Sequence, residues 1–118
     1  MIVDDHEAMR TLISRVLARA GVESVRTAAN GVAALQALRE RPARLVLADQ
    51  NMPGMDGLAF IRALRADNAL GSPRIVMVSG QTGAEHADAA RAAGADAVLA
   101  KPVSPRDLLA AINDLFAV

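Results

Sequence analysis

Residues 45–57 read Leu-Val-Leu-Ala-Asp-Gln-Asn-Met-Pro-Gly-Met-Asp-Gly, and this stretch decides the fold. Its first four residues are all apolar, as in a parallel strand that is covered by helices on both faces. The remainder has no apolar period and contains Pro53 and Gly54, which is typical of a loop. The strand therefore delivers the Asp49 carboxylate to its carboxyl end, the edge where ligands bind in parallel α/β sheets.

The rest of the chain alternates between short apolar runs and helical periodicity. Strands are predicted at residues 1–3, 22–28, 45–48, 75–78 and 97–100. Helices are predicted at 7–20, from 31 to before Pro42, and at 57–66, 83–93 and 105–116, with Ser104 as the cap of the last helix. The periodicity places Leu12, Val32 and Phe116 among the apolar faces of their helices. Five strand–helix repeats predict a parallel sheet with helices on both faces, and residues 1–118 are expected to form a single domain.

The composition excludes several classes of function. The 118 residues include 13 basic and 13 acidic side chains, so no basic field attracts nucleic acid. No apolar stretch approaches the roughly 18 residues of a membrane span, and no signal peptide is visible. Because there is no cysteine, disulfides and thiolate metal sites are excluded. These features fit a cytoplasmic protein that binds neither membranes nor DNA directly.

Polar residues follow four of the five predicted strands. The first strand ends at Asp4 and Asp5, the third at Asp49, the fourth at Ser79 and the fifth at Lys101. Each has an ordinary explanation when it is considered alone: a helix cap, a turn, a strand-end hydroxyl, or a solvated lysine. Because the carboxyl ends of parallel strands share one edge, all four strand ends are expected to meet there, and the ordinary explanations do not account for the whole set.

The grouped side chains favour phosphoryl chemistry. Three carboxylates in contact repel one another, and a divalent cation removes that repulsion. Oxygen-only ligands, with no His or Cys, favour Mg²⁺ over zinc, and such a site completes its ligand shell with water and a phosphoryl oxygen. Ser79 and Lys101 supply a hydrogen-bond donor and a positive charge for the phosphate. Asp49 is the best placed nucleophile, since a carboxylate is already ionised and needs no general base.

Four motifs together resemble those of the response regulator receiver domain, the CheY-like domain of two-component signalling. The motifs are Val3-Asp4-Asp5, residues 49–57, Val78-Ser79-Gly80 and Lys101-Pro102, and the resemblance covers residues 2–116. Asn51-Met52-Pro53 and the Arg65-Ala66-Asp67 turn are most similar to single-domain chemotaxis-type receivers. The resemblance implies a flavodoxin-like doubly wound (βα)5 fold with strand order 2-1-3-4-5.

The resemblance also implies roles for individual residues. Asp49 would be the phosphoacceptor, receiving phosphate from a histidine kinase or a histidine phosphotransfer protein. Mg²⁺ would be bound directly by Asp5 and Asp49, through water by Asp4, and by the backbone carbonyl of Asn51. Ser79 would donate a hydrogen bond to the phosphoryl group, and Lys101 would pair with it by charge. A cis peptide bond would join Lys101 to Pro102.

Such a domain is a switch rather than a classical enzyme, although it catalyses its own phosphorylation and dephosphorylation. It would switch the binding of a downstream protein through the face formed by its fourth helix, fifth strand and fifth helix. A monomer is expected, with dimerisation on activation left open. Whether the chain acts by docking alone or is a receiver from a longer protein is also left open.

Val98 departs from the family pattern. Many receivers carry Tyr or Phe at this position, three residues before the lysine, and this chain has no Tyr or Trp. The usual aromatic switch therefore cannot operate in its usual form. Gln50, Asn51 and Gln81 are expected to flank the attacking water. His6 is expected to sit only at the start of the first helix, and His86 is expected to be solvated.

Two other functions compete with the phosphorylated switch. Val98 and the short first strand favour a receiver-like module that docks partners without phosphorylation. A flavodoxin-like cofactor binder would share the architecture. The second alternative is disfavoured, because no glycine-rich loop follows the first strand and only two aromatic residues are present.

Overall fold

The computed structural model describes residues 1–80 and 83–116. A parallel sheet forms its centre, with strands β1 (Ile2–Val3), β2 (Thr27–Ala28), β3 (Leu45–Asp49), β4 (Arg74–Ser79) and β5 (Ala97–Ala100). The strands lie in the order β2-β1-β3-β4-β5, and every neighbouring pair is parallel. The predicted flavodoxin-like (βα)5 class and its strand order 2-1-3-4-5 are confirmed.

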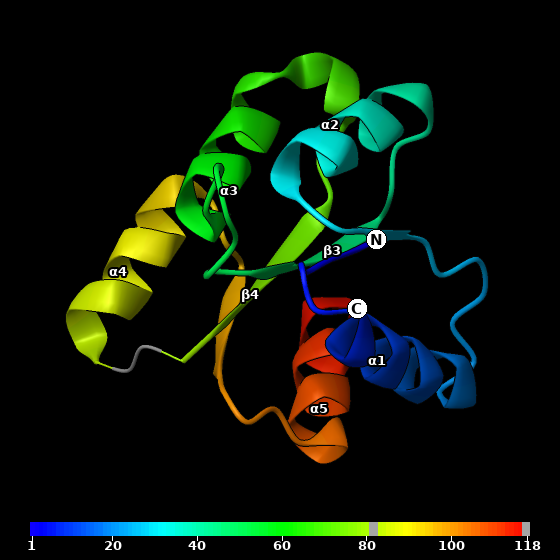
Figure 1. The fold of residues 1–118 in the computed structure, drawn as a ribbon. Coiled ribbons are helices and arrows are strands. Elements are labelled where there is room, and N and C mark those ends of the chain that lie inside the picture. The colour runs from blue at the N-terminus through cyan, green and yellow to red at the C-terminus, as the bar shows by residue number, and fades with distance from the viewer. Residues whose placement is uncertain (81–82, 117–118) are drawn as a thin grey trace.

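Helices cover both faces of the sheet. The α-helices are α1 (Glu7–Arg19), α2 (Gly31–Glu40), α3 (Gly57–Ala66), α4 (Ala84–Ala93) and α5 (Pro105–Phe116), and a short 3₁₀ helix, η1 (Asn68–Leu70), follows α3. Helices α2, α3 and α4 lie on one face of the sheet, and α1 and α5 lie on the other (Figure 1). None of the helices within the described ranges is long and apolar enough to cross a membrane.

Side chains at the helix starts satisfy backbone N–H groups that would otherwise lack partners. Asn30 Oδ1 accepts a hydrogen bond from the N–H of Ala33 at 2.8 Å, and Ser104 Oγ accepts one from the N–H of Asp107 at 3.0 Å. Each such cap stabilises its helix by about 1 kcal/mol. The predicted Ser104 cap is confirmed, and it fixes the direction of α5 beside the strand that precedes it.

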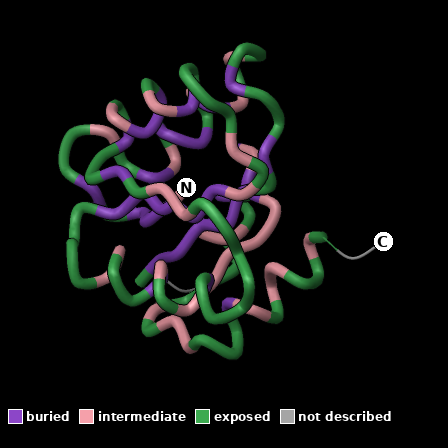
Figure 2. The backbone as a smooth tube through the Cα atoms, turned by 90° about the vertical axis from the view of Figure 1, so that its right-hand side faces the viewer, coloured by how far each residue is buried: buried purple, intermediate pink, exposed green. Residues whose placement is uncertain are grey.

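The sheet separates two hydrophobic cores, because side chains alternate between its faces along each strand. Val46 and Met77 face the larger core beneath α2, α3 and α4, whereas Leu47 and Val76 face the smaller core beneath α1 and α5. Most residues of β1, β3 and β4 are buried and form the centre of the backbone in Figure 2. Each fully buried aliphatic or aromatic side chain contributes about 1.5–3 kcal/mol of transfer free energy. These cores hold the carboxyl edge of the sheet rigid.

The second strand is much shorter than the predicted span of 22–28. Ser24 adopts a left-handed backbone conformation with φ of 56°, which interrupts an extended strand. The guanidinium of Arg26 donates hydrogen bonds to the carbonyl oxygens of Ala37 and Arg41 at the end of α2. Local turn geometry and a long-range contact therefore limit β2 to two residues.

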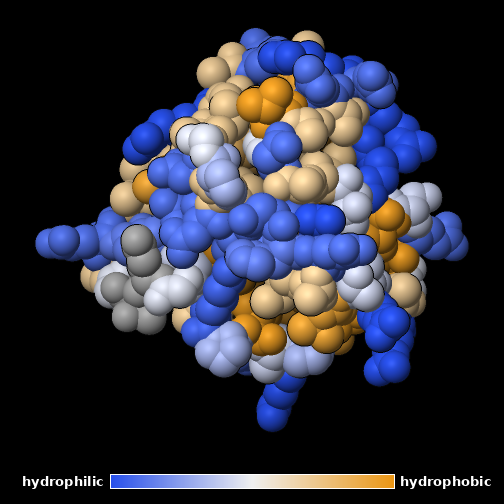
Figure 3. Space-filling model, in the orientation of Figure 1, coloured by the Kyte–Doolittle hydropathy of each residue, from blue (hydrophilic) through white to orange (hydrophobic). Residues whose placement is uncertain are grey.

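Three apolar side chains that the periodicity placed on buried faces are exposed. Leu12 is 51% exposed and Val32 is 54% exposed, because each lies one residue, or about 100° of helix rotation, from its helix's buried stripe. Phe116 is also exposed, and its ring contacts the guanidinium of Arg44, whose Cζ atom lies 5.6 Å from the ring centre. Figure 3 shows small apolar patches separated by a hydrophilic band on one face of the molecule.

Candidate functional site

The strand ends meet as their sequence positions predict. Asp49 ends β3 with only 2% of its surface exposed, and Ser79 ends β4 fully buried. The register pairs Asp49 with Val78 and Ser79 with Ala100, so the two strands end side by side. Lys101 follows β5, and its Nζ atom lies 2.6 Å from Asp49 Oδ1. Three strands thus place a carboxylate, a hydroxyl and an ammonium group at one edge.

The end of β1 adds acidic side chains to this edge. One donor atom from each of Asp4, Asp5, His6 and Asp49 lies within 4.8 Å of all the others. Asp4 is buried, and its Oδ1 accepts a hydrogen bond from the N–H of His6 at 2.9 Å. The side chain of Arg10 donates to the Asp4 carbonyl oxygen at 2.7 Å, which ties α1 to the end of the strand. The local fold therefore holds buried acids together despite their like charges.

Asp49 has far fewer partners than its burial demands. Both of its carboxylate oxygens are buried, and among the described residues neither accepts a hydrogen bond of good geometry. The Lys101 ammonium contacts Oδ1 as an ion pair, because a separation of 2.6 Å between opposite charges is strongly attractive whatever the direction of the N–H bonds. A buried carboxylate with open lone pairs calls for a cation or hydrogen-bond donors. The donor set of neighbouring acids fits Mg²⁺, which prefers oxygen ligands.

The loop after Asp49 is fixed by Gln50. Its side-chain Oε1 accepts the N–H of Leu58 at 3.0 Å, and its carbonyl oxygen accepts the N–H of Gly57 at 3.0 Å. A Cβ atom at Gly57 would lie 2.7 Å from the carbonyl oxygen of Asp49, so a larger residue does not fit there. The amide oxygen of Gln50 therefore caps the start of α3, and its place beside the attacking water stays a prediction. Asn51 follows it in an exposed position.

Both histidines differ from their predicted environments. His6 Nδ1 lies 3.1 Å from Oδ1 of Asp4 and 3.1 Å from Oδ1 of Asp5, so this side chain joins the acidic group instead of only starting α1. His86 is not fully solvated as predicted, since its Nε2 atom is buried without a hydrogen-bond partner in residues 1–80 and 83–116. The position of His6 directly after Asp5 was the available signal for its proximity to the acids.

The end of the fifth strand matches one prediction. The Lys101–Pro102 peptide bond is cis, as the resemblance implied. Val98 is partly buried and packs against the larger core, where it pairs with Met77 of β4. Gln81, which was also predicted to flank the attacking water, lies outside the described residues. The strand therefore carries an aliphatic side chain at the position that is aromatic in many receivers.

A hollow of about 520 Å³ lies at the opposite edge of the sheet and does not belong to this site. It is lined by Met1, Arg26, Phe116 and their neighbours, and it contains none of the clustered carboxylates. The acidic site is a surface assembly with buried ligand atoms instead of a deep cavity. Its chemistry is therefore defined by its charged groups, and it fits an ion and a phosphoryl group better than a large organic molecule.

A doubly wound parallel sheet with acids, a hydroxyl and a lysine at its carboxyl edge defines the class of CheY-like receiver domains. The sequence matches the response regulator receiver domain family over residues 1–113. The chain belongs to this family, and it is a receiver domain of the kind found in two-component response regulators.

Similar proteins support this assignment. The chain is 33% identical over 116 residues to a probable chemotaxis protein CheY of Rhizobium etli, an alignment that covers 98% of this chain and 90% of that protein. It is 34% identical over 109 residues to chemotaxis protein CheY1 of Helicobacter pylori, covering 92% and 88% of the two chains. Its structure resembles that of CheY4 of Vibrio cholerae with a TM-score of 0.90 and 33% identity, covering 98% and 95% of the two chains.

Proposed function

We propose that this chain is a single receiver domain in which Asp49 accepts a phosphoryl group in an Mg²⁺-dependent reaction. The observation that carries the proposal is the environment of Asp49, which is buried, lacks hydrogen bonds among the described residues, and has Lys101 Nζ 2.6 Å away. Burying a carboxylate in this way costs desolvation free energy, which a bound cation or hydrogen-bond donors would offset. A nucleophile that must approach a phosphoryl group and a cation requires open lone pairs of this kind.

The transfer moves a phosphoryl group from a phosphohistidine to Asp49. The N–P bond of the donor breaks, an O–P bond forms to a carboxylate oxygen of Asp49, and the leaving imidazole takes up a proton from solvent. Lys101 neutralises charge on the phosphoryl oxygens, and Ser79 donates a hydrogen bond to one of them. Asp5, Asp49 and the carbonyl of Asn51 would hold Mg²⁺ directly and Asp4 would hold it through water, and the ion would supply positive charge for the phosphoryl group. The rigid strand ends provide alignment, which is the main catalytic requirement for a loose transition state.

The partners follow from this chemistry and from the family. The donor is a histidine kinase or a histidine phosphotransfer protein, and the response is altered binding of a downstream protein through α4, β5 and α5. We place the reaction in the cytoplasm, and we expect a monomer, with dimerisation on activation left open. The same active site also hydrolyses the acyl phosphate, so the domain catalyses its own reset.

Phosphorylation by a small-molecule donor tests the proposal. Native protein and Asp49→Ala are incubated with acetyl phosphate and Mg²⁺, and the intact mass is measured before and after. Native protein is expected to gain one phosphoryl group, and Asp49→Ala none, while circular dichroism confirms that both are folded. Equal modification of the two proteins would refute the assignment of Asp49.

Val98 supports a second candidate function, docking without phosphorylation. Because β5 carries Val98 instead of an aromatic side chain, the usual aromatic switch cannot transmit a change at Ser79 to the α4–β5–α5 face. Binding of beryllium fluoride with Mg²⁺ separates the two functions, because this phosphoryl mimic needs the complete site. Tight binding that Asp49→Ala abolishes excludes the docking-only function.

A further inference from the structure

His6 brings a nitrogen donor into an otherwise oxygen-only acidic site. Its Nδ1 atom lies 3.1 Å from Oδ1 of Asp4 and 3.1 Å from Oδ1 of Asp5, and one ligand atom from each of Asp4, Asp5, His6 and Asp49 lies within 4.8 Å of the others. The His6 side chain is 67% exposed, so its other ring nitrogen can carry a proton in contact with solvent. The imidazole therefore has one nitrogen that points at the acids and is available as a ligand.

The spacing of these atoms matches that of ligands around one ion. Ligand atoms about 2.1 Å from a dication and at right angles to each other are about 3.0 Å apart. The two separations of 3.1 Å from Nδ1 agree with this value. The largest separation in the group, up to 4.8 Å, exceeds the roughly 4.2 Å of opposite ligands by a few tenths of an ångström. Because His6 and Asp5 are exposed, small side-chain rotations can close that difference.

Hydrogen bonding alone explains the position of His6 poorly. A single Nδ1–H group faces two carboxylate oxygens at equal distance, and it can be directed well at only one of them. His6 also gives no hydrogen bond to Asp49, whose buried oxygens have only the Lys101 ion pair among the described residues. A cation among these atoms would serve Asp4, Asp5, His6 and Asp49 together.

We propose that His6 is a nitrogen ligand at the acidic site and that it biases this site toward first-row transition-metal dications relative to Mg²⁺. Imidazole is a good ligand for Ni²⁺, Zn²⁺ and Cu²⁺, whereas Mg²⁺ prefers oxygen and retains its waters. The inference rests on the proposed function only in assuming that the acidic site binds a dication. It needs no phosphoryl transfer.

The affinity ratio for two metals tests the proposal. Dissociation constants for Ni²⁺ and for Mg²⁺ are measured by calorimetry on untagged native protein, His6→Ala and His6→Gln. Even groups that only orient a metal ligand contribute about 10- to 100-fold to affinity. Both variants are therefore expected to weaken Ni²⁺ binding at least about tenfold while the Mg²⁺ constant changes less than about threefold. An unchanged ratio of the two constants overturns the proposal.

His86→Ala is the matched control, because His86 is the other histidine of the chain and lies on α4. It is expected to leave both constants unchanged, and an equal loss of Ni²⁺ affinity in this variant would also overturn the proposal. Pulsed electron paramagnetic resonance of the Mn²⁺-loaded protein gives an independent readout. It should detect coupling to a nitrogen ligand in native protein and in His86→Ala but not in His6→Ala.

The two proposals can fail separately. If acetyl phosphate does not modify Asp49 but the metal ratio depends on His6, the phosphoacceptor function fails and the nitrogen ligand stands. If Asp49 is phosphorylated equally in native protein and His6→Ala while the metal ratio is the same in both, the receiver chemistry stands and the nitrogen ligand fails.

Discussion

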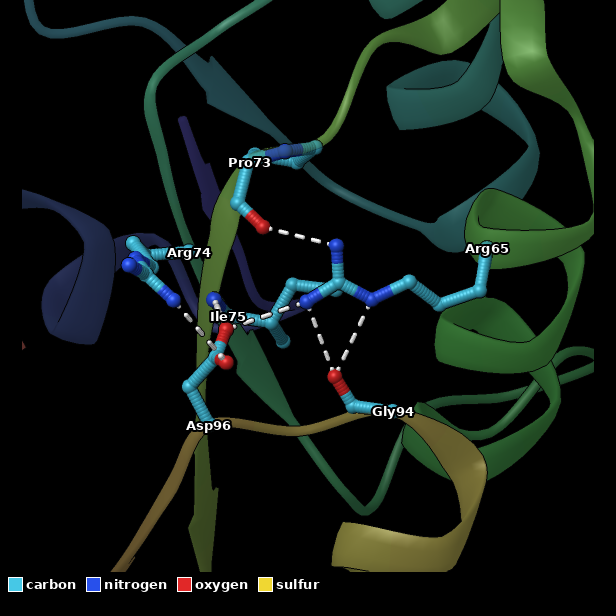
Figure 4. Close-up of polar contacts among 6 residues, drawn as sticks. All are labelled: Arg65, Pro73, Arg74, Ile75, Gly94 and Asp96. Atoms are coloured by element: carbon cyan, nitrogen blue, oxygen red, sulfur yellow. Dashed lines mark hydrogen bonds and ion pairs between the residues drawn. The ribbon is translucent and has the colours of Figure 1, made fainter.

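The two ends of the sheet carry charged side chains that differ in how many hydrogen-bond partners they have within the chain. At the carboxyl edge, Asp49 is buried and accepts no hydrogen bond from the described residues. At the amino edge, the guanidinium of Arg65 donates to the carbonyl oxygens of Gly94 and Pro73 and to the carboxylate of Asp96, at 2.8–3.0 Å (Figure 4). The amino edge thus satisfies its charged groups within the chain, whereas the buried Asp49 carboxylate has only the Lys101 ammonium beside it.

The amino-edge group, which we call the arginine cluster, joins four elements. It consists of Arg65, Pro73, Arg74, Ile75, Gly94 and Asp96. Arg65 lies in α3, and its partners lie at the start of β4, at the end of α4 and before β5. Asp96 also accepts the backbone N–H of Ile75 at 2.8 Å, so the same carboxylate binds Arg65 and fixes the entry to β4. Arg65 and Asp96 each have several partners within the chain.

Under the proposed function, the carboxyl edge would receive such partners from a bound cation and a phosphoryl group. A hydrogen bond to a charged group contributes about 1.5–3 kcal/mol, so a buried carboxylate without one forgoes stabilisation of that order. A cation or phosphoryl group that binds at Asp49 would restore that stabilisation. The difference between the two ends can be tested by removing the internal partner at one end and by adding the external ligand at the other.

Removing Arg65 should produce the largest change. Arg65→Ala eliminates four hydrogen bonds and leaves Asp96 without its main cation, and both side chains are mostly buried, at 28% and 24% exposed. We expect the free energy of unfolding in urea to fall by about 3 kcal/mol. Arg65→Lys keeps the charge but not the planar fork, and it should recover less than half of the loss. A loss below 1 kcal/mol in the alanine variant contradicts the role of the cluster.

The sequence predicted the carboxyl edge better than the amino edge. Asp49, Ser79 and Lys101 each end an apolar run, and parallel strands bring their carboxyl ends together, so local patterns were sufficient. The contact between Arg65 and Asp96 spans 31 residues and depends on the exact length of a flexible side chain. No periodicity encodes such a contact, and Arg65 entered the sequence analysis only as part of a turn.

Two other features that the sequence did not predict, the Gln50 cap and the exposure of Leu12, also depend on tertiary packing. The hydrogen bond from the N–H of Leu58 to Oε1 of Gln50 joins residues eight positions apart across a loop. It requires the backbone at Gly57 to lie close to that of Asp49 and Gln50. The position of Leu12 beside Ile13 placed it within the apolar pattern, but the width of the buried stripe depends on how α1 sits on the sheet. The apolar pattern predicts which segments are helices and strands, whereas the contacts and burial of individual side chains depend on how those elements pack.

Adding Mg²⁺ should stabilise the protein through the carboxyl edge alone. At a concentration about 100 times the dissociation constant, binding to the folded state adds about 2.7 kcal/mol to the free energy of unfolding. The same increment is expected in Arg65→Lys. The two clusters lie at opposite ends of β4, about 16 Å apart for six residues of strand, and distant sites act additively. Urea unfolding with and without Mg²⁺ measures both increments, and unequal values would mean that the two ends are coupled.

The backbone contact behind Asp49 predicts a smaller change. In Gly57→Ala, the new Cβ atom would lie 2.7 Å from the carbonyl oxygen of Asp49 and 2.8 Å from Cα of Gln50. Relief of this overlap should cost about 2 kcal/mol of stability and should displace Asp49, so Mg²⁺ affinity falls as well. Gly80→Ala is the matched control, because a Cβ atom there meets open space. Equal stability of the two variants would show that the loop yields without cost.

Neutralising Asp49 should change stability least, and it separates the charge of the carboxylate from its shape. Asp49→Asn loses the attraction to Lys101, but it also removes the repulsion from Asp4 and Asp5 and the cost of burying a charge. Without Mg²⁺, we expect the free energy of unfolding to stay the same or to rise by up to about 1 kcal/mol. With Mg²⁺ at saturation the order reverses, because only the native protein gains the binding energy. A variant that is markedly less stable without metal would mean that the ion pair with Lys101 outweighs the burial cost, and the carboxyl edge would then be internally satisfied in the same way as the arginine cluster.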